Sequence, residues 1–238
     1  MIKKSLLFIL IIMLSVGFAQ QHKMEHLNED EVDLKYLFSL PKDYYSAKKK
    51  AWPLILFLHG MGERGDDLEL VKIHGIPKIV KTQKDFPFIA VSPQCPTEYV
   101  WRDRKMLQAV ESLILKIIKN YRIDKTRVYV TGLSMGGYGT WALAARRPDL
   151  FAAAVPICGG GDPAIVNVLK NLPIWVFHGG LDKVVLPEES EKMIRALEKA
   201  GGKVHYTLYP EAYHDSWTET YDNPALYDWM LSKRKGEN

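Results

Sequence analysis

The segment Gly132–Gly136 (GLSMG) places a serine between two glycines, each two residues away. The pattern G-x-S-x-G is typical of a nucleophilic serine in a sharp turn from a strand into a helix. A match arises by chance in roughly one chain in twelve of this length, so the pattern does not decide the matter alone. β-Branched residues precede it and alanines follow it, which favours the strand–turn–helix setting. We predict Ser134 as a nucleophile and the Met135 amide, at the helix start, as an oxyanion donor.

A serine hydroxyl needs a base to act as a nucleophile near neutral pH. The chain has seven histidines. His214 differs from the others because it follows the last expected strand in a loop and lies C-terminal to both the serine and a candidate acid. We therefore predict His214 as general base and then general acid. The alternative is a surface loop histidine or a helix cap.

Three aspartates compete for the role of the acid that orients this histidine. Asp215 adjoins His214, and adjacent residues do not easily present facing side chains. Asp162 and Asp182 both follow expected strand ends. Asp182 is the prediction because its strand directly precedes the one that leads to His214, so their loops should be neighbours. The resulting chain order, Ser134, Asp182, His214, is that of the α/β-hydrolases.

A second oxyanion donor is expected in the loop after an earlier strand, within residues 58–65 (LHGMGERG). The candidate is the amide of Met61, since Gly60 and Gly62 let the backbone approach a substrate. Glu63 and Arg64 are interpreted as locking this loop through ion pairs rather than as performing chemistry.

Aromatic residues follow two of the expected strands. Trp101, Tyr99 and Trp217 lie in segments beyond strand ends, where ligands bind in open α/β sheets. We expect Trp101 and Trp217 to form an aromatic wall for an acyl or sugar group. The alternative is ordinary packing beneath the loops.

The two cysteines, Cys95 and Cys158, also fall in loops at this edge. A disulfide between them would need loops that converge, because their strands are not expected to be adjacent, and the question stays open. Two cysteines cannot form a four-thiolate zinc site. We expect neither a metal nor a cofactor.

The elements that must position these residues alternate along the chain. Apolar runs of strand length end in glycine, proline or polar residues, whereas the intervening segments show apolar residues every three or four positions. The expected strands are 32–40, 52–58, 86–91, 127–131, 152–157, 173–177 and 204–208, and the expected helices include 107–121, 135–146 and 187–200. This alternation predicts a single α/β domain over residues 32–238, with a mostly parallel sheet flanked by helices on both faces.

The N-terminus has a different composition. Residues 6–18 carry no charge and follow two lysines, and small residues come next, as in a signal peptide cleaved after Ala19. The alternative is an uncleaved anchor. We expect a signal peptide at 1–19, a flexible lead-in at 20–31 and a secreted or periplasmic protein. Without the leader, the formal charge of +4 becomes +2, so nucleic acid is not an expected partner, nor is stable membrane insertion after cleavage.

Six motifs together carry a family resemblance: HGMGERG, SPQCP, GLSMGG, CGGGD, HGGLDKVV and YHDSW. The chain resembles secreted bacterial carboxylesterases of the α/β-hydrolase superfamily, near the dienelactone hydrolase, feruloyl esterase and polyhydroxybutyrate depolymerase branches, some of whose relatives are described as predicted peptidases. The resemblance covers residues 32–233. It implies Ser134, Asp182 and His214 as the catalytic triad.

The activity expected from these residues is hydrolysis of short acyl or aryl esters by a serine esterase. The resemblance implies acetyl or feruloyl esters on plant polysaccharides, so the substrate is a small-molecule or polysaccharide-attached ester. Short connections at 65–86 and 159–173 leave no room for a large lid. The alternatives are a small serine peptidase, a polyester depolymerase, or a non-catalytic binding module on the same fold.

Overall fold

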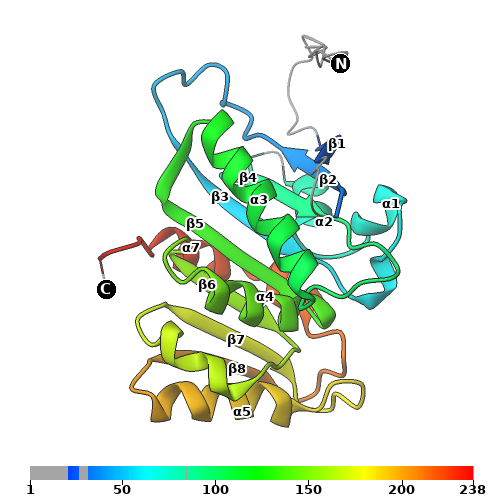
Figure 1. Ribbon diagram of the computed structural model, residues 1–238, viewed down its shortest axis with the longest axis vertical. Coiled ribbons are helices and arrows are strands. Elements are labelled where there is room, and N and C mark those ends of the chain that lie inside the picture. The colour runs from blue at the N-terminus through cyan, green and yellow to red at the C-terminus, as the bar shows by residue number, and fades with distance from the viewer. Residues whose placement is uncertain (1–20, 27–31, 84, 238) are drawn as a thin grey trace, which may run out of the picture.

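The computed structural model describes residues 21–26, 32–83 and 85–237, which form one eight-stranded sheet in the order β1-β2-β4-β3-β5-β6-β7-β8 (Figure 1). From β4 to β8 across the sheet, neighbouring strands are parallel, whereas β1 and β2 run antiparallel to their neighbours. The strands are β1 (Gln21–His26), β2 (Leu34–Ser39), β3 (Trp52–Leu58), β4 (Ile89–Pro93), β5 (Ile123–Leu133), β6 (Ala153–Ile157), β7 (Ile174–Gly179) and β8 (Val204–Tyr209).

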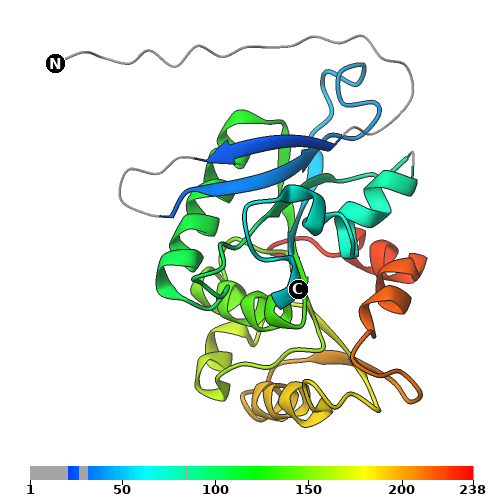
Figure 2. The same cartoon turned by 90° about the vertical axis from the view of Figure 1, so that its right-hand side faces the viewer.

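Helices cover both faces of this sheet (Figure 2). One face packs against α3, α4, α5 and η2, and the other against α2, α6 and α7. The helical segments are η1 (Met61–Glu63), α1 (Leu68–Val71), α2 (Gly75–Thr82), α3 (Arg104–Asn120), α4 (Met135–Arg146), η2 (Pro163–Leu169), α5 (Pro187–Lys199), α6 (Trp217–Asp222) and α7 (Pro224–Leu231). No helix in the described part of the chain is both long and apolar enough to cross a membrane.

The central strand β3 shows why apolar runs form this sheet. Its side chains alternate between the two faces, so Leu54 and Leu56 join the core beneath α3 and α4, while Ile55 and Phe57 join the core beneath α2 and α6. All four are fully buried. A strand that is buried on both faces needs apolar side chains at every position, which explains the run WPLILFL. The predicted α/β class, with a mostly parallel sheet flanked on both faces, is confirmed.

The first strand corrects the expectation of a flexible lead-in at 20–31. Gln21–His26 pairs with β2 in register from Gln21 opposite Ser39 to His26 opposite Leu34. An edge strand is held by backbone hydrogen bonds and needs few apolar side chains. The polar sequence QHKMEH therefore gives no sign of a strand. Met24 packs against the core, and the ring of His26 is buried near Ser112. The expected signal peptide, residues 1–19, lies outside the described residues.

Candidate active site

The predicted nucleophile lies at the junction of β5 and α4. Ser134 has φ 52° and ψ −117°, a conformation that costs a non-glycine residue free energy and persists only where the surroundings impose it. The Ser134 amide donates to the Ile157 carbonyl at 2.9 Å, and the Tyr138 amide donates to the Ser134 carbonyl at 3.1 Å. The turn is therefore tied to β6 on one side and to the first turn of α4 on the other.

The two flanking glycines are required by close approach of the backbone. A Cβ atom on Gly136 would lie 1.9 Å from the carbonyl oxygen of Leu58 in β3, and a Cβ on Gly132 would lie 2.4 Å from the carbonyl oxygen of Gly136. Neither contact can be accommodated without moving backbone. The sharp turn into α4 thus exists because no side chain separates it from β3.

Three predicted residues meet at the carboxyl ends of β5, β7 and β8. Ser134 Oγ lies 3.0 Å from His214 Nε2, and His214 Nδ1 lies 2.7 Å from Asp182 Oδ2. Because Nδ1 donates to the carboxylate, Nε2 is left to accept the serine proton. The Asp182 side chain is fully buried, whereas that of His214 is 20% exposed. The structure thus brings together the serine, the histidine and the acid, as the strand order predicted.

The carboxylate of Asp182 is held from several directions. Its Oδ1 accepts from the amides of Val184 and Val185, at 2.9 and 3.0 Å. Its Oδ2 also lies 3.2 Å from Nε2 of a second histidine, His178. Sequence reasoning assigned His178 only to the end of a strand, although its position four residues before the acid in HGGLD was a usable signal.

The other candidate acids have different roles. Asp162 begins η2, where its Oδ1 accepts from the Ala164 amide at 2.9 Å. Asp215 precedes α6, and its two oxygens accept from the amide and the hydroxyl of Thr218 at 3.0 Å. Both carboxylates stabilise the start of a helical segment rather than facing His214.

The two candidate oxyanion donors lie on either side of the serine. Met135 is the first residue of α4, so its amide has no acceptor within the helix. Met61 begins η1, directly after Gly60, and a Cβ on Gly60 would lie 3.8 Å from Ser134 Cβ. The loop that carries Met61 therefore runs beside the serine, as the sequence predicted.

This loop is fixed by hydrogen bonds to backbone, which refines the expectation of ion pairs. Glu63 Oε2 accepts from the Gly60 amide at 2.7 Å, and the Arg64 guanidinium donates to the carbonyl of Thr97 at 2.7 Å. Trp101 anchors the strand end below, since its Nε1 donates to the carbonyl of His59 at 2.8 Å.

The two tryptophans predicted to form a substrate wall have different surroundings. Trp101 is only 1% exposed and packs on Gly139 of α4, so the prediction that it forms a substrate wall is wrong. Its position beyond a strand end was read correctly, but the loop folds inward and buries the indole. Trp217 is half-buried and lies edge-on to His214, with ring centroids 5.2 Å apart. It is thus the member of the predicted pair that lies beside the candidate base.

Both cysteines are free, buried thiols. Burial raises the pKa of Cys95 to about 12, and burial also raises the pKa of Cys158 far above its usual range. Cys158 Sγ lies within 4.8 Å of a carboxylate oxygen of Asp182 and a ring nitrogen of His214. A neutral thiol at this position adds no second negative charge beside Asp182.

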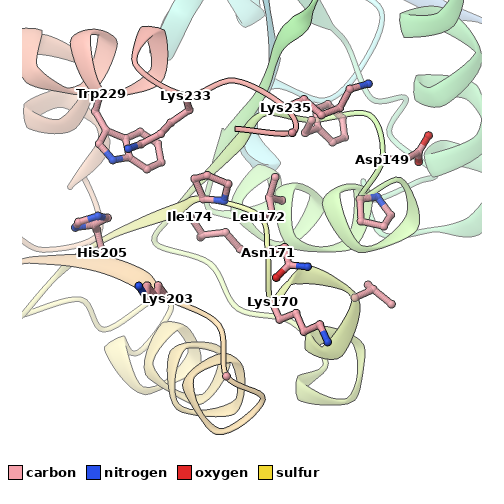
Figure 3. Close-up of a pocket in the computed structure, with 16 residues that line it drawn as sticks. Asp149, Lys170, Asn171, Leu172, Ile174, Lys203, His205, Trp229, Lys233 and Lys235 are labelled. Carbon is pink, nitrogen blue, oxygen red and sulfur yellow. The ribbon is translucent and has the colours of Figure 1, made fainter. Parts of the chain in front are cut away.

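A cavity of about 940 Å³ opens at the opposite end of the sheet, where β7 and β8 begin (Figure 3). Its lining includes Lys170, Lys203, Lys233 and the indole of Trp229, and none of the predicted site residues. The candidate active site is separate from this cavity. It lies at the carboxyl edge of the sheet, which is the edge where α/β sheets bind ligands.

A strained serine between β5 and α4, followed by an acid after β7 and a histidine after β8, defines an α/β-hydrolase. Residues 77–228, more than half of the chain, match the dienelactone hydrolase family, and the chain belongs to that family. The matched residues include Ser134, Asp182 and His214.

Known proteins similar to this chain include hydrolases of several substrates. A solved structure described as a thermostable esterase is 37% identical, with a TM-score of 0.78, over 90% of this chain and 63% of that one. Poly(3-hydroxyalkanoate) depolymerase C of Paucimonas lemoignei is 29% identical over 173 residues, which are 67% of this chain and 40% of that protein. A bifunctional acetylxylan esterase/xylanase of Neocallimastix patriciarum is 29% identical over 60% of this chain and 21% of that protein. The matched region is thus less than half of either curated relative.

Proposed function

We propose that this protein is a serine esterase that acts through an acyl-enzyme. Ser134 attacks the ester carbonyl, and His214 accepts its proton while Asp182 holds the imidazole. The amides of Met61 and Met135 stabilise the oxyanion, His214 protonates the leaving alcohol, and water then hydrolyses the acyl-enzyme. The observation that carries this proposal is the hydrogen-bonded chain from Ser134 Oγ through His214 to Asp182, at 3.0 and 2.7 Å.

The proposed substrates are short acyl or aryl esters, with acetyl or feruloyl groups on plant polysaccharide as the leading class. Support comes from the acetylxylan esterase/xylanase among the relatives and from the connections after β3 and β6, residues 59–88 and 158–173, which hold only short helical segments. A polymer-attached ester needs an approachable nucleophile, and the partly exposed ring of His214 fits that requirement.

A polyester is the second candidate substrate. The relative from Paucimonas lemoignei, described as a poly(3-hydroxyalkanoate) depolymerase, supports it over 67% of this chain. The chemistry at Ser134 would be the same, because both classes present an ester carbonyl. The two substrate classes therefore differ in the groups on either side of the ester, and the residues around Ser134 would select between them.

A substrate panel tests the proposal. Wild-type protein should hydrolyse p-nitrophenyl acetate, and Ser134→Ala should lose this activity, whereas Ser46→Ala, at an exposed serine, should retain it. Acetylated xylan, methyl ferulate, a polyhydroxyalkanoate film and a peptide anilide then separate the substrate classes. Absence of Ser134-dependent turnover on every ester would favour a binding module instead.

We also propose export by the segment 1–19. The support is its composition, together with the start of β1 at Gln21, so cleavage after Ala19 removes no described element. N-terminal sequencing of protein expressed with its leader in a bacterial host should give Gln20 as the first residue. A mature chain that still begins at Met1 would contradict the proposal.

A further inference from the structure

Two buried histidines occupy matching places in the fold. His59 follows β3 and His178 lies near the end of β7, and each precedes a glycine. The exposed fractions of the two residues are 1% and 0%. The reaction proposed above gives a role to neither ring. Their hydrogen-bond partners, however, demand different numbers of ring protons.

The ring of His59 carries one proton. Its Nδ1 lies 2.6 Å from the Gly60 carbonyl oxygen, which can only accept, so Nδ1 donates. Its Nε2 accepts from the Cys95 amide at 3.0 Å and therefore has no proton. Burial lowers the pKa of His59 to about 4, in agreement with a neutral ring.

The ring of His178 has acceptors on both sides. Nε2 lies 2.9 Å from the Val185 carbonyl oxygen and 3.2 Å from Asp182 Oδ2, and neither atom can donate. Nδ1 lies 2.7 Å from Ser190 Oγ, which in turn lies 2.9 Å from the Gly159 carbonyl oxygen, an atom that can only accept. Ser190 has a single hydrogen, so all of these partners are satisfied together only if Ser190 donates to Gly159 and both ring nitrogens of His178 donate.

The carboxylate of Asp182 has two basic side chains as neighbours. Within the described residues, the only basic side chains within 4.0 Å of its carboxylate are those of His178 and His214. A donor from His178 adds to the hydrogen bonds that hold this buried carboxylate in place.

We propose that His178 is a doubly protonated positioning residue, which fixes the Asp182 carboxylate for His214. The two histidines share Oδ2 of Asp182, while the amides of Val184 and Val185 hold Oδ1. The carboxylate then cannot rotate away from His214 without breaking charge-assisted hydrogen bonds. The catalytic part of this inference rests on the proposed function, whereas the protonation state rests on the hydrogen-bond partners alone.

The protonation state can be measured in wild-type protein without an activity assay. In protein labelled with ¹⁵N-histidine at pH 7.5, both ring nitrogens of His178 should show directly bonded protons, whereas His59 should show one protonated and one unprotonated nitrogen. Loss of the His178 signals in His178→Gln assigns them. A single ring proton on His178 would overturn the inference.

Kinetics test the positioning role. His178→Leu should lower kcat by about 10- to 100-fold with little change in KM, because a charge-assisted hydrogen bond is lost but substrate contacts are kept. His178→Gln keeps an N–H donor toward Asp182 and should retain more of kcat. The control is His205→Gln, at an exposed histidine of β8, which should behave as wild type.

Two further readouts separate this role from simple damage to the fold. The Nδ1 proton of His214, which lies in the bond to Asp182, should shift its NMR signal in His178→Leu. Equal losses of kcat in His178→Leu and His178→Gln, with an unshifted His214 signal, would overturn the positioning role. If His178→Leu does not fold, kcat of His178→Gln still tests the positioning role and the wild-type spectrum still tests the protonation state of His178. If wild-type protein lacks Ser134-dependent turnover, the proposed function fails and the protonation state is still tested.

Discussion

The carboxylate of Asp182 faces a histidine, whereas that of Asp162 faces a helix start. Asp182→Asn should therefore lower kcat/KM by about 10⁴-fold, because the amide cannot hold the correct imidazole tautomer or stabilise the imidazolium. Asp162→Asn should change kcat/KM little. Ester hydrolysis by the two purified variants checks this, and a larger loss in Asp162→Asn would reassign the acid.

Which residues could be predicted depends on whether their surroundings are local. Ser134 lies in a turn whose glycines are close in sequence, and the order of the strands links Asp182 to His214. Trp101 could not be placed, because its burial depends on the distant Gly139. The spacing of His178 and Asp182 was a usable local signal, but the contact of His178 with Ser190 in another element could not be predicted.

At the level of elements, the contact between α4 and β3 sets the turn at the serine. Gly136→Ala would force a Cβ to within 1.9 Å of the Leu58 carbonyl oxygen. We expect a loss of about 1–3 kcal/mol or more in the free energy of unfolding, together with loss of esterase activity. Urea unfolding measures the first effect.

The matched control for this glycine is Gly62→Ala. No atom lies within 4 Å of a Cβ built on Gly62, so unfolding should change by no more than about 0.5 kcal/mol. Similar destabilisation in the two variants would show that close approach to β3 is not what requires glycine at 136.

The strands of the parallel region were predicted more accurately than the edge of the sheet. The run 52–58 became β3 at the same bounds, because a strand buried on both faces is apolar throughout. The polar segment of β1 gives no such signal, since backbone pairing with β2 holds it in place. The short helices α6 and α7 were also not predicted, as each spans eight residues or fewer.

At the scale of the whole molecule, stability should fall as the pH falls from about 6.5 to about 4. The pKa of His59 is lowered from 6.5 to about 4 in the folded protein, so in this interval the unfolded chain binds a proton that the folded protein does not. The contribution of His59 to the free energy of unfolding is complete above pH 6.5. Its loss is on the order of 3 kcal/mol by pH 4.

Urea unfolding of wild type and His59→Gln across this interval measures the effect. The variant should show a flatter dependence on pH, although His26, whose pKa is also lowered by burial, keeps part of the slope. His205→Gln serves as the control and should retain the wild-type dependence. Parallel curves for wild type and His59→Gln would contradict the assignment.

The strand order also determines when the sheet can be completed as the chain is synthesised. From β5 to β8, each new strand adds beside the previous one, but β3 lies between β4 and β5, and Leu54 pairs with Val128 across a long stretch of sequence. Until β5 has left the ribosome, β3 has an open, fully apolar edge. Such edges pair with other chains, so we expect nascent or truncated forms that end before β5 to be the ones that aggregate.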